Sequence, residues 1–486
     1  MLKNRTMAGV LWNFLEQLSK RGISIAVTLL LARLLLPEDF GLLAMMSVFV
    51  TIASVLMDSG LKQAVIRKKN AQQIDYNTAF YANILVGILS YSLLYISAPW
   101  ISSFYDEPRL VLLIRVAGLL VIINSFQIVQ SAILSRKLNF KAQLQASVPA
   151  SILSGSIAVF LAYSGAGVWA LVAQMMLSGL LLTIFLWRLQ SWRPSLTFSW
   201  SSFKGMYSFG YKLFLASLLS HFTKNIYVLT IGSVFGTTVA GLYYFAYRLK
   251  ELVVSQLVSA VQKVTFPALA TMQDDNVRLK KSYRKVLRAT TFVLFPCILL
   301  TASLAEPLFE FALPERWLDA SNYLQLMFLA SMLYPLHAIN LNILKIKGRT
   351  DVYLGISVFR KFFTFFVLFI SYRYGVVGIL VGQIFLSIFA YVPNSYYSHK
   401  LIGYSVREQL ADCASSFILS SVIFSVIYFS VQFFVWSPLV KLLFFAPLGV
   451  MLYVGLAKIF KVKAYKQIEE LVRSRLKIRR IGRKYV

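Results

Sequence analysis

Long apolar segments dominate this sequence and restrict it to one kind of fold. A helix that crosses a bilayer needs about 20 consecutive apolar residues, and about fourteen such segments can be placed here. Membrane β-barrels show short strands of alternating polarity instead. The segments therefore predict an all-α integral membrane protein. Their approximate centres are Arg21, Val48, Leu89, Ile122, Ser154, Leu177, His221, Lys250, Phe295, Ala330, Phe362, Ile384, Ile423 and Val450.

Composition and the placement of charge support this prediction. Of the 486 residues, 58% are hydrophobic and only 14% are charged, against roughly 25% charged in an average soluble domain. The net charge of +30 would suit a nucleic-acid-binding protein. Lys and Arg gather in every second loop, however, which is the positive-inside pattern of membrane proteins. We therefore expect a multi-pass protein that contacts membrane lipids and no nucleic acid, with both termini in the cytoplasm.

Two weak internal matches predict that the chain repeats one six-helix unit. The stretch GVWALVAQMMLS aligns with VVGILVGQIFLS, which places Gln174 on Gln383, and a second match places Gly41 on Gly241. An even number of helices per copy predicts a parallel repeat with two pseudo-symmetric lobes. The predicted boundaries are 1–187 for the N-lobe (helices 1–6), 188–205 for a cytoplasmic linker, 206–400 for the C-lobe (helices 7–12), 401–460 for two further helices and 461–486 for a basic cytoplasmic tail.

Charged residues near the middle of three predicted helices are candidates for a substrate site. A Lys or Arg at the bilayer centre costs ~2.5–3.5 kcal/mol on insertion scales, so such residues need a partner or a wet cavity. Because Arg and Lys both bind phosphate well, the cations predict an electropositive chamber for a pyrophosphate or similar anion. The candidates are Lys20, Arg21, His221, Lys224 and Arg248, with Asn13, Gln17, Ser24 and Glu251 as supporting polar residues.

The alternative for these charges is pairing within their own helices. Glu16 precedes Lys20 by one turn, and Glu251 follows Arg248 by one turn, which are the spacings that favour ion pairs. His221 is either a packing residue or a group that couples transport to protons. Three cations keep no acidic partner nearby in the sequence after this pairing: Arg21, Lys224 and Lys250.

No motif predicts an enzyme. The sequence has no P-loop, no His/Cys cluster at metal-ligand spacing and no serine-triad signature. The segment Glu306–Ala320 is the best candidate for a catalytic outer loop, but its acidic residues are ordinary for such a loop. We therefore expect no catalytic residue, no metal and no cofactor.

Five stretches together resemble bacterial polysaccharide exporters. They are WNFLEQLSKRGISIAVTLLLARLLLPEDFGLLAM, DSGLKQAVIRKK, WRPSLTFSWSSFKGMYSFGYKL, FPALATMQDDNVRLKKSYRKVL and LYPLHAINLNILKIKGRTD. The resemblance is to the oligosaccharide-lipid flippases of the multidrug/oligosaccharidyl-lipid/polysaccharide exporter superfamily, in the teichuronic and colanic acid exporter branch. It covers residues 1 to about 460.

The resemblance implies a two-lobed bundle that works by alternating access. It implies that the cargo is an undecaprenyl-pyrophosphate-linked oligosaccharide, a surface polysaccharide precursor, moved from the inner to the outer leaflet of the bacterial cytoplasmic membrane. It further implies that helices 1, 2, 7 and 8 line the cavity, that Lys20 and Arg21 match basic positions of related lipid II flippases, and that a monomer works beside polymerase and assembly proteins. A cation-coupled drug exporter of the same fold and a membrane glycan polymerase or ligase stay open as alternatives.

Overall fold

The computed structural model describes residues 2–470, and only the backbone is described for residues 2–11, 13, 14, 255–257, 260, 263, 264 and 267. Over this part of the chain the regular structure consists of helices, and no strand occurs. The predicted all-α fold is confirmed. Contacts divide the chain into two compact units, Met1–Tyr244 and Phe245–Val486, which we call unit 1 and unit 2.

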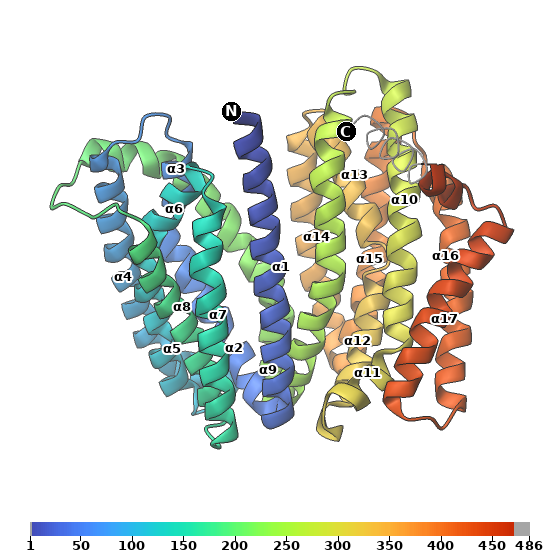
Figure 1. The fold of residues 1–486 in the computed structure, drawn as a ribbon, viewed down its shortest axis with the longest axis horizontal. Helices are drawn as coiled ribbons and strands as arrows, with labels where there is room; N and C mark the ends of the chain where they lie inside the picture. The colour runs from blue at the N-terminus through green and yellow to red at the C-terminus, as the bar shows by residue number, and fades with distance from the viewer. Residues whose placement is uncertain (1, 471–486) are drawn as a thin grey trace, which may run out of the picture. The chain divides into compact units, whose positions relative to one another are not determined.

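Unit 1 is a helical bundle in which helices distant in the chain, as well as neighbours, pack side by side. α7 packs against both α1 and α8, and α2 packs against α4 and α5. The break in α9 falls at Gly236, whose φ of 80° is unfavourable for any residue with a side chain. The helices, coloured blue to green in Figure 1, are α1 (Leu2–Leu34), α2 (Pro37–Asp58), α3 (Leu61–Arg67), α4 (Gln73–Tyr105), α5 (Leu110–Ser125), α6 (Ile128–Arg136), α7 (Phe140–Tyr163), α8 (Val168–Leu189) and the first part of α9 (Trp200–Ala270).

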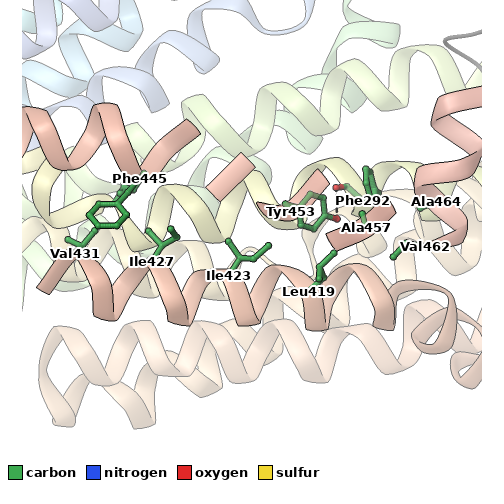
Figure 2. Packing of buried hydrophobic residues seen from close by; sticks show 11 residues of the cluster. Phe292, Leu419, Ile423, Ile427, Val431, Phe445, Tyr453, Ala457, Val462 and Ala464 are labelled. Atoms are coloured by element: carbon green, nitrogen blue, oxygen red, sulfur yellow. Dashed lines mark hydrogen bonds between the residues drawn. The ribbon is translucent and has the colours of Figure 1, made fainter. Parts of the chain in front are cut away.

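Unit 2 holds the rest of α9 and the remaining helices. Its last two long helices pack on α10 through a buried apolar cluster (Figure 2). Within that cluster the hydroxyl of Tyr453 donates to the carbonyl of Phe292 over 2.9 Å. The elements are α10 (Asn276–Ser303), α11 (Ala305–Ala312), η1 (Glu315–Trp317), α12 (Asp319–Ala330), α13 (Tyr334–Ile346), α14 (Thr350–Ser371), η2 (Tyr372–Tyr374), α15 (Gly375–Ile402), α16 (Val406–Phe433) and α17 (Pro438–Ile459).

The chain is a multi-pass membrane protein, but the predicted count of spans is not confirmed. Each predicted centre lies inside a helix. Among the described residues, 10 stretches are long and apolar enough to cross a membrane, or 11 if the bent pair α5 and α6 counts as one. Two stretches are very long, Trp200–Val254 with 55 residues and Thr350–Ile402 with 53. The first contains the break at Gly236 and the second contains η2. Each of these long stretches counts once by length but holds two of the predicted apolar centres, so the two counts differ.

The connection between α8 and α9 is fixed to the N-terminal end of α4. The fully buried Asn77 donates from Nδ2 to Ser195 Oγ and to Thr197 Oγ1, both over 2.6 Å, and its Oδ1 accepts from the Ser195 amide at 3.3 Å. Trp192 of the same connection packs edge-on against Phe80, with ring centroids 5.7 Å apart. This segment of the predicted linker is therefore an ordered part of unit 1.

Replacing Asn77 by alanine is expected to detach this connection and to lower the free energy of unfolding by about 1–3 kcal/mol, since a buried polar group loses its partners. The measurement is the thermal unfolding midpoint in detergent, together with the rate of chymotryptic cleavage after the exposed Phe198 of this connection. The exposed Asn70 of the α3–α4 connection gives the matched control, Asn70→Ala. Equal midpoints and cleavage rates for the two variants would contradict the fixed connection.

Candidate functional site

The predicted pair between Glu16 and Lys20 is confirmed on α1. The Lys20 Nζ lies 3.8 Å from Glu16 Oε1, and the Lys20 side chain is 42% exposed. Glu16 also accepts a hydrogen bond from Ser147 Oγ of α7 at 3.3 Å. The carboxylate is thus shared between a cation and the helix packed beside it, which holds this turn of α1 in one orientation.

Arg21, the next residue, keeps unused hydrogen-bonding capacity. Its side chain is half-buried, and its Nη1 is buried with no hydrogen-bond partner. It forms no ion pair among the side chains that the structure describes. An unpartnered buried donor of a charged group is costly, so a guanidinium in this state is a good candidate to contact an anionic ligand.

The structure adds two charges near this part of α1, Asp58 at the end of α2 and Lys62 in α3. The Lys62 amide donates to Asp58 Oδ1 over 3.3 Å. Burial lowers the pKa of the Lys62 amine, the Asp58 charge opposes that shift, and the positive charge of Lys20 adds to it. Lys62 therefore lies within electrostatic reach of Lys20. We call Glu16, Lys20, Asp58 and Lys62 the α1–α3 charge cluster.

A sharp turn explains why Lys62 returns to the bundle. Ser59 and Gly60 both have positive φ, 43° and 74°, which reverses the chain between α2 and α3. Gly60 lies directly against the backbone of Gly210 in α9, where any side chain on either residue would overlap. The sequence SG after an acidic helix end is the signal that could have placed Lys62 back beside Asp58.

The candidates on α9 lie on a segment that is anchored at its ends and exposed in its middle. Gly210 contacts Ser59 and Gly60, while Gly232 leaves room for Met45 and Tyr105. Most residues from 211 to 224 are half-buried or exposed. Two close glycine contacts thus hold the segment in unit 1 and leave its middle accessible.

His221 and Lys224 lie in this accessible middle. His221 is half-buried and Lys224 is exposed, and the backbone carbonyl of His221 accepts from Asn225 Nδ2 at 2.8 Å. Among the described side chains, no ion pair involves Lys224, and no hydrogen bond or ion pair joins it or His221 to Lys20 or Arg21. The candidates of unit 1 therefore lie on two helices, α1 and α9, and no described hydrogen bond or ion pair joins them.

Arg248 and Glu251 lie on the part of α9 that belongs to unit 2. The Lys250 Nζ lies 2.8 Å from Glu251 Oε1 and 4.4 Å from the centroid of the Tyr247 ring. The prediction that Lys250 has no acidic partner is therefore wrong, because its neighbour in the chain turns toward it. Pairing between Arg248 and Glu251 stays a prediction.

The structure describes the side chains of two of the three supporting residues on α1. Gln17 and Ser24 are half-buried, whereas the side chain of Asn13 lies outside the described residues.

The described part of the chain contains no group of three or more His, Cys, Asp or Glu side chains that could hold a metal ion. What the described geometry offers is positive charge at the accessible faces of α1 and α9, which suits an anion.

Comparisons with known proteins agree with the fold. The family described as polysaccharide biosynthesis protein matches residues 30–322. The teichuronic acid biosynthesis protein TuaB of Bacillus subtilis (strain 168) is 24% identical over 447 residues, 89% of this chain and 92% of the relative. The lipopolysaccharide biosynthesis protein WzxC of Escherichia coli (strain K12) is 23% identical over 427 residues, 86% of each chain.

Two solved structures share the fold. The lipid II flippase MurJ in an inward closed conformation has a TM-score of 0.75 and 13% identity, and the match covers 93% of this chain and 98% of that one. An inward-facing multidrug resistance transporter of the MATE family has a TM-score of 0.60 and 18% identity, with coverage of 80% and 96%. At these identities the likeness concerns the fold alone.

Proposed function

We propose, from the premise that this chain belongs to the polysaccharide biosynthesis protein family, that it is a flippase for a lipid-linked oligosaccharide. The oligosaccharide would be a precursor of a surface polysaccharide, carried on undecaprenyl pyrophosphate. The chain would move it from the inner to the outer leaflet of the bacterial cytoplasmic membrane by alternating access. Relatives named for teichuronic acid and lipopolysaccharide biosynthesis support this substrate class.

One observation carries the proposal in this chain: Arg21 and Lys224 are cations without an acidic partner among the described residues, and they lie far from the ends of their helices. Cations at such depth are rare unless they serve a substrate or ion path. A pyrophosphate supplies the missing negative charge, and it accepts the charge-assisted hydrogen bonds that Arg and Lys donate. A transporter of organic cations would more readily carry Asp or Glu at these positions.

We assign the pyrophosphate contacts to Lys20, Arg21, His221 and Lys224 of unit 1 and to Arg248 of unit 2. Asn13, Gln17, Ser24 and Glu251 would support them. The α1–α3 charge cluster fixes the direction of Lys20 through Glu16, so Arg21 is the residue with the greater capacity to bind the anion. Lys62 joins this assignment as a contributor of positive potential through its proximity to Lys20.

The proposal includes an architecture and a mode of action. The two six-helix lobes would be residues 1–187 and 206–400, joined by the linker 188–205 and followed by two helices and a cytoplasmic tail. Both termini would face the cytoplasm. The chain would act as a transporter and not as an enzyme, so the oligosaccharide would leave it chemically unchanged.

Deletion of the gene in its own bacterium, with and without complementation, tests this function. Loss of one surface polysaccharide and accumulation of its lipid-linked precursor in cells, both restored by the wild-type chain, is the expected result. Greater drug susceptibility with an unchanged glycan would favour the drug exporter instead. Elongation or ligation of the lipid-linked sugar by the purified protein in detergent would favour a polymerase or ligase.

A further inference from the structure

A second cationic site lies outside all the residues assigned above. A cavity of about 590 Å³ opens in unit 1 between the C-terminal end of α3 and the N-terminal ends of α4 and α9. Its volume falls in the range of small-molecule sites. The polar and charged residues that line it include Arg67, Lys68, Lys69, Asp75, Ser201 and Ser202.

The carboxylate of this cavity is already satisfied, which leaves the cavity positive. The buried Asp75 accepts from Lys68 Nζ over 2.6 Å and from Ser202 Oγ over 2.5 Å. Arg67 is exposed and lies over the ring of Phe209, 4.3 Å from its centroid, and Lys69 is exposed. Neither Arg67 nor Lys69 forms an ion pair among the described residues. Two cations therefore remain available to a ligand.

The rest of the wall also favours an anion. α9 begins here at Trp200, and an exposed hydroxyl, that of Ser201, stands in its first turn. Helix N-termini carry partial positive charge, which adds to that of the two cations. At Gly205 a Cβ atom would meet nothing within 4 Å, so the position is open and a larger side chain would project into the space.

We propose that this cavity binds a phosphoryl group, with Arg67 and Lys69 as the residues that contact it and Asp75 as the residue that positions Lys68. The ligand chemistry is a phosphate ester that carries an apolar part, because Ile74, Met206 and Phe209 form an apolar part of the wall. Two ligands carry such a phosphoryl group. An anionic membrane lipid has both the phosphate and the apolar part, whereas soluble phosphate or pyrophosphate has the charged part alone. The site does not depend on the proposed flippase function.

The test is thermal unfolding of the purified full chain in a nonionic detergent, titrated with one of three probes. The probes are dioleoyl phosphatidylglycerol, the matching diacylglycerol without phosphate, and sodium pyrophosphate at constant ionic strength. A ligand that binds the folded state raises the unfolding midpoint. We expect phosphatidylglycerol to raise it and diacylglycerol to leave it unchanged; stabilisation by pyrophosphate alone would instead identify a soluble anion as the ligand.

Two variants test whether the cavity is responsible. The double variant Arg67→Gln/Lys69→Gln is expected to raise the half-saturating ligand concentration by about tenfold or more, because it removes two charge-assisted contacts. Gly205→Leu is also expected to raise the half-saturating ligand concentration, because its side chain would fill the cavity without a change of charge. The matched control Lys137→Gln/Arg188→Gln removes two exposed cations of unit 1 and should bind as the wild type does.

Wild-type affinity in both the double variant and Gly205→Leu would overturn the proposal, as would the absence of stabilisation of the wild type by any phosphate-containing probe. If Gly205→Leu fails to fold, the double variant decides alone, since both of its positions are exposed. Because the readout is ligand binding in detergent, a loss of binding is distinguishable from a failure to export polysaccharide.

Discussion

Replacement of Arg21 by glutamate is expected to abolish export of the surface polysaccharide while the protein is still made at its normal level. The substitution should be tolerated by the fold, because Arg21 is half-buried and forms no ion pair in the described structure. It would place a carboxylate where the pyrophosphate is proposed to bind. Each hydrogen bond to a charged group is worth ~1.5–3 kcal/mol, so the loss of attraction together with the new repulsion should lower transport by about a hundredfold or more.

The measurement is the amount of surface polysaccharide in complemented deletion cells, normalised to the amount of protein in the membrane. Lys224→Glu is expected to give the same defect from α9. Lys137→Glu makes the same change of charge at an exposed position between α6 and α7 and should export normally. Normal export by both Arg21→Glu and Lys224→Glu, at normal protein levels, would show that neither cation serves the substrate.

Replacement of Asp412 by alanine is expected to give the largest loss of stability. This nearly buried carboxylate of α16 accepts from Arg284 Nε over 2.7 Å, from Arg288 and from the hydroxyl of Tyr404 over 2.6 Å. Burial raises the pKa of Tyr404, so its hydroxyl remains a donor. Removing the acid leaves Arg288 without its partner and leaves Arg284 only the longer contact to Glu408 at 3.9 Å, and breaking a buried ion pair costs about 3–5 kcal/mol. We expect the lower end, since Arg284 is partly exposed.

Thermal unfolding of the two purified proteins in detergent measures this effect. The matched control is Asp351→Ala, because Asp351 also pairs with an arginine, Arg349, but both side chains are largely exposed. Exposed pairs contribute about 0–1 kcal/mol, so the control should unfold near the wild-type temperature. Equal unfolding temperatures for Asp412→Ala and Asp351→Ala would mean that Asp412 does not hold α10 to α16.

Hydrophobicity predicts the long helices of this protein and also the division of α9 into two parts. Apolar segments must be helical in a membrane because every backbone group needs an internal partner, and the predicted centres accordingly fall in helices. The break at Gly236 lies between the separate predicted centres His221 and Lys250. Its exact position was not predictable, because a single glycine in an apolar run is compatible with a continuous helix. The structure adds close backbone contacts near the break, where side chains on Gly41 or Gly241 would overlap with the Thr237 or Pro37 carbonyl.

The candidate site was predictable where it depends on spacing along one helix. The pair Glu16 and Lys20 follows from a spacing of one turn and is present. The pair between Lys250 and Glu251 does not follow from such a spacing, because neighbouring residues of a helix do not face each other. Their long side chains must bend to meet. Lys62 was missed for another reason: a tertiary turn, not a helical spacing, brings it near Lys20.

Transport in sealed vesicles tests most directly whether the protein moves the lipid-linked oligosaccharide between leaflets. Purified protein is reconstituted with the oligosaccharide-lipid, and the fraction exposed outside is followed with a membrane-impermeant glycosidase. We predict that wild-type vesicles expose the inner pool with time, and that Arg21→Glu vesicles retain it as protein-free vesicles do. Retention of the inner pool by wild-type vesicles, or equal exposure with Arg21→Glu, would contradict the account.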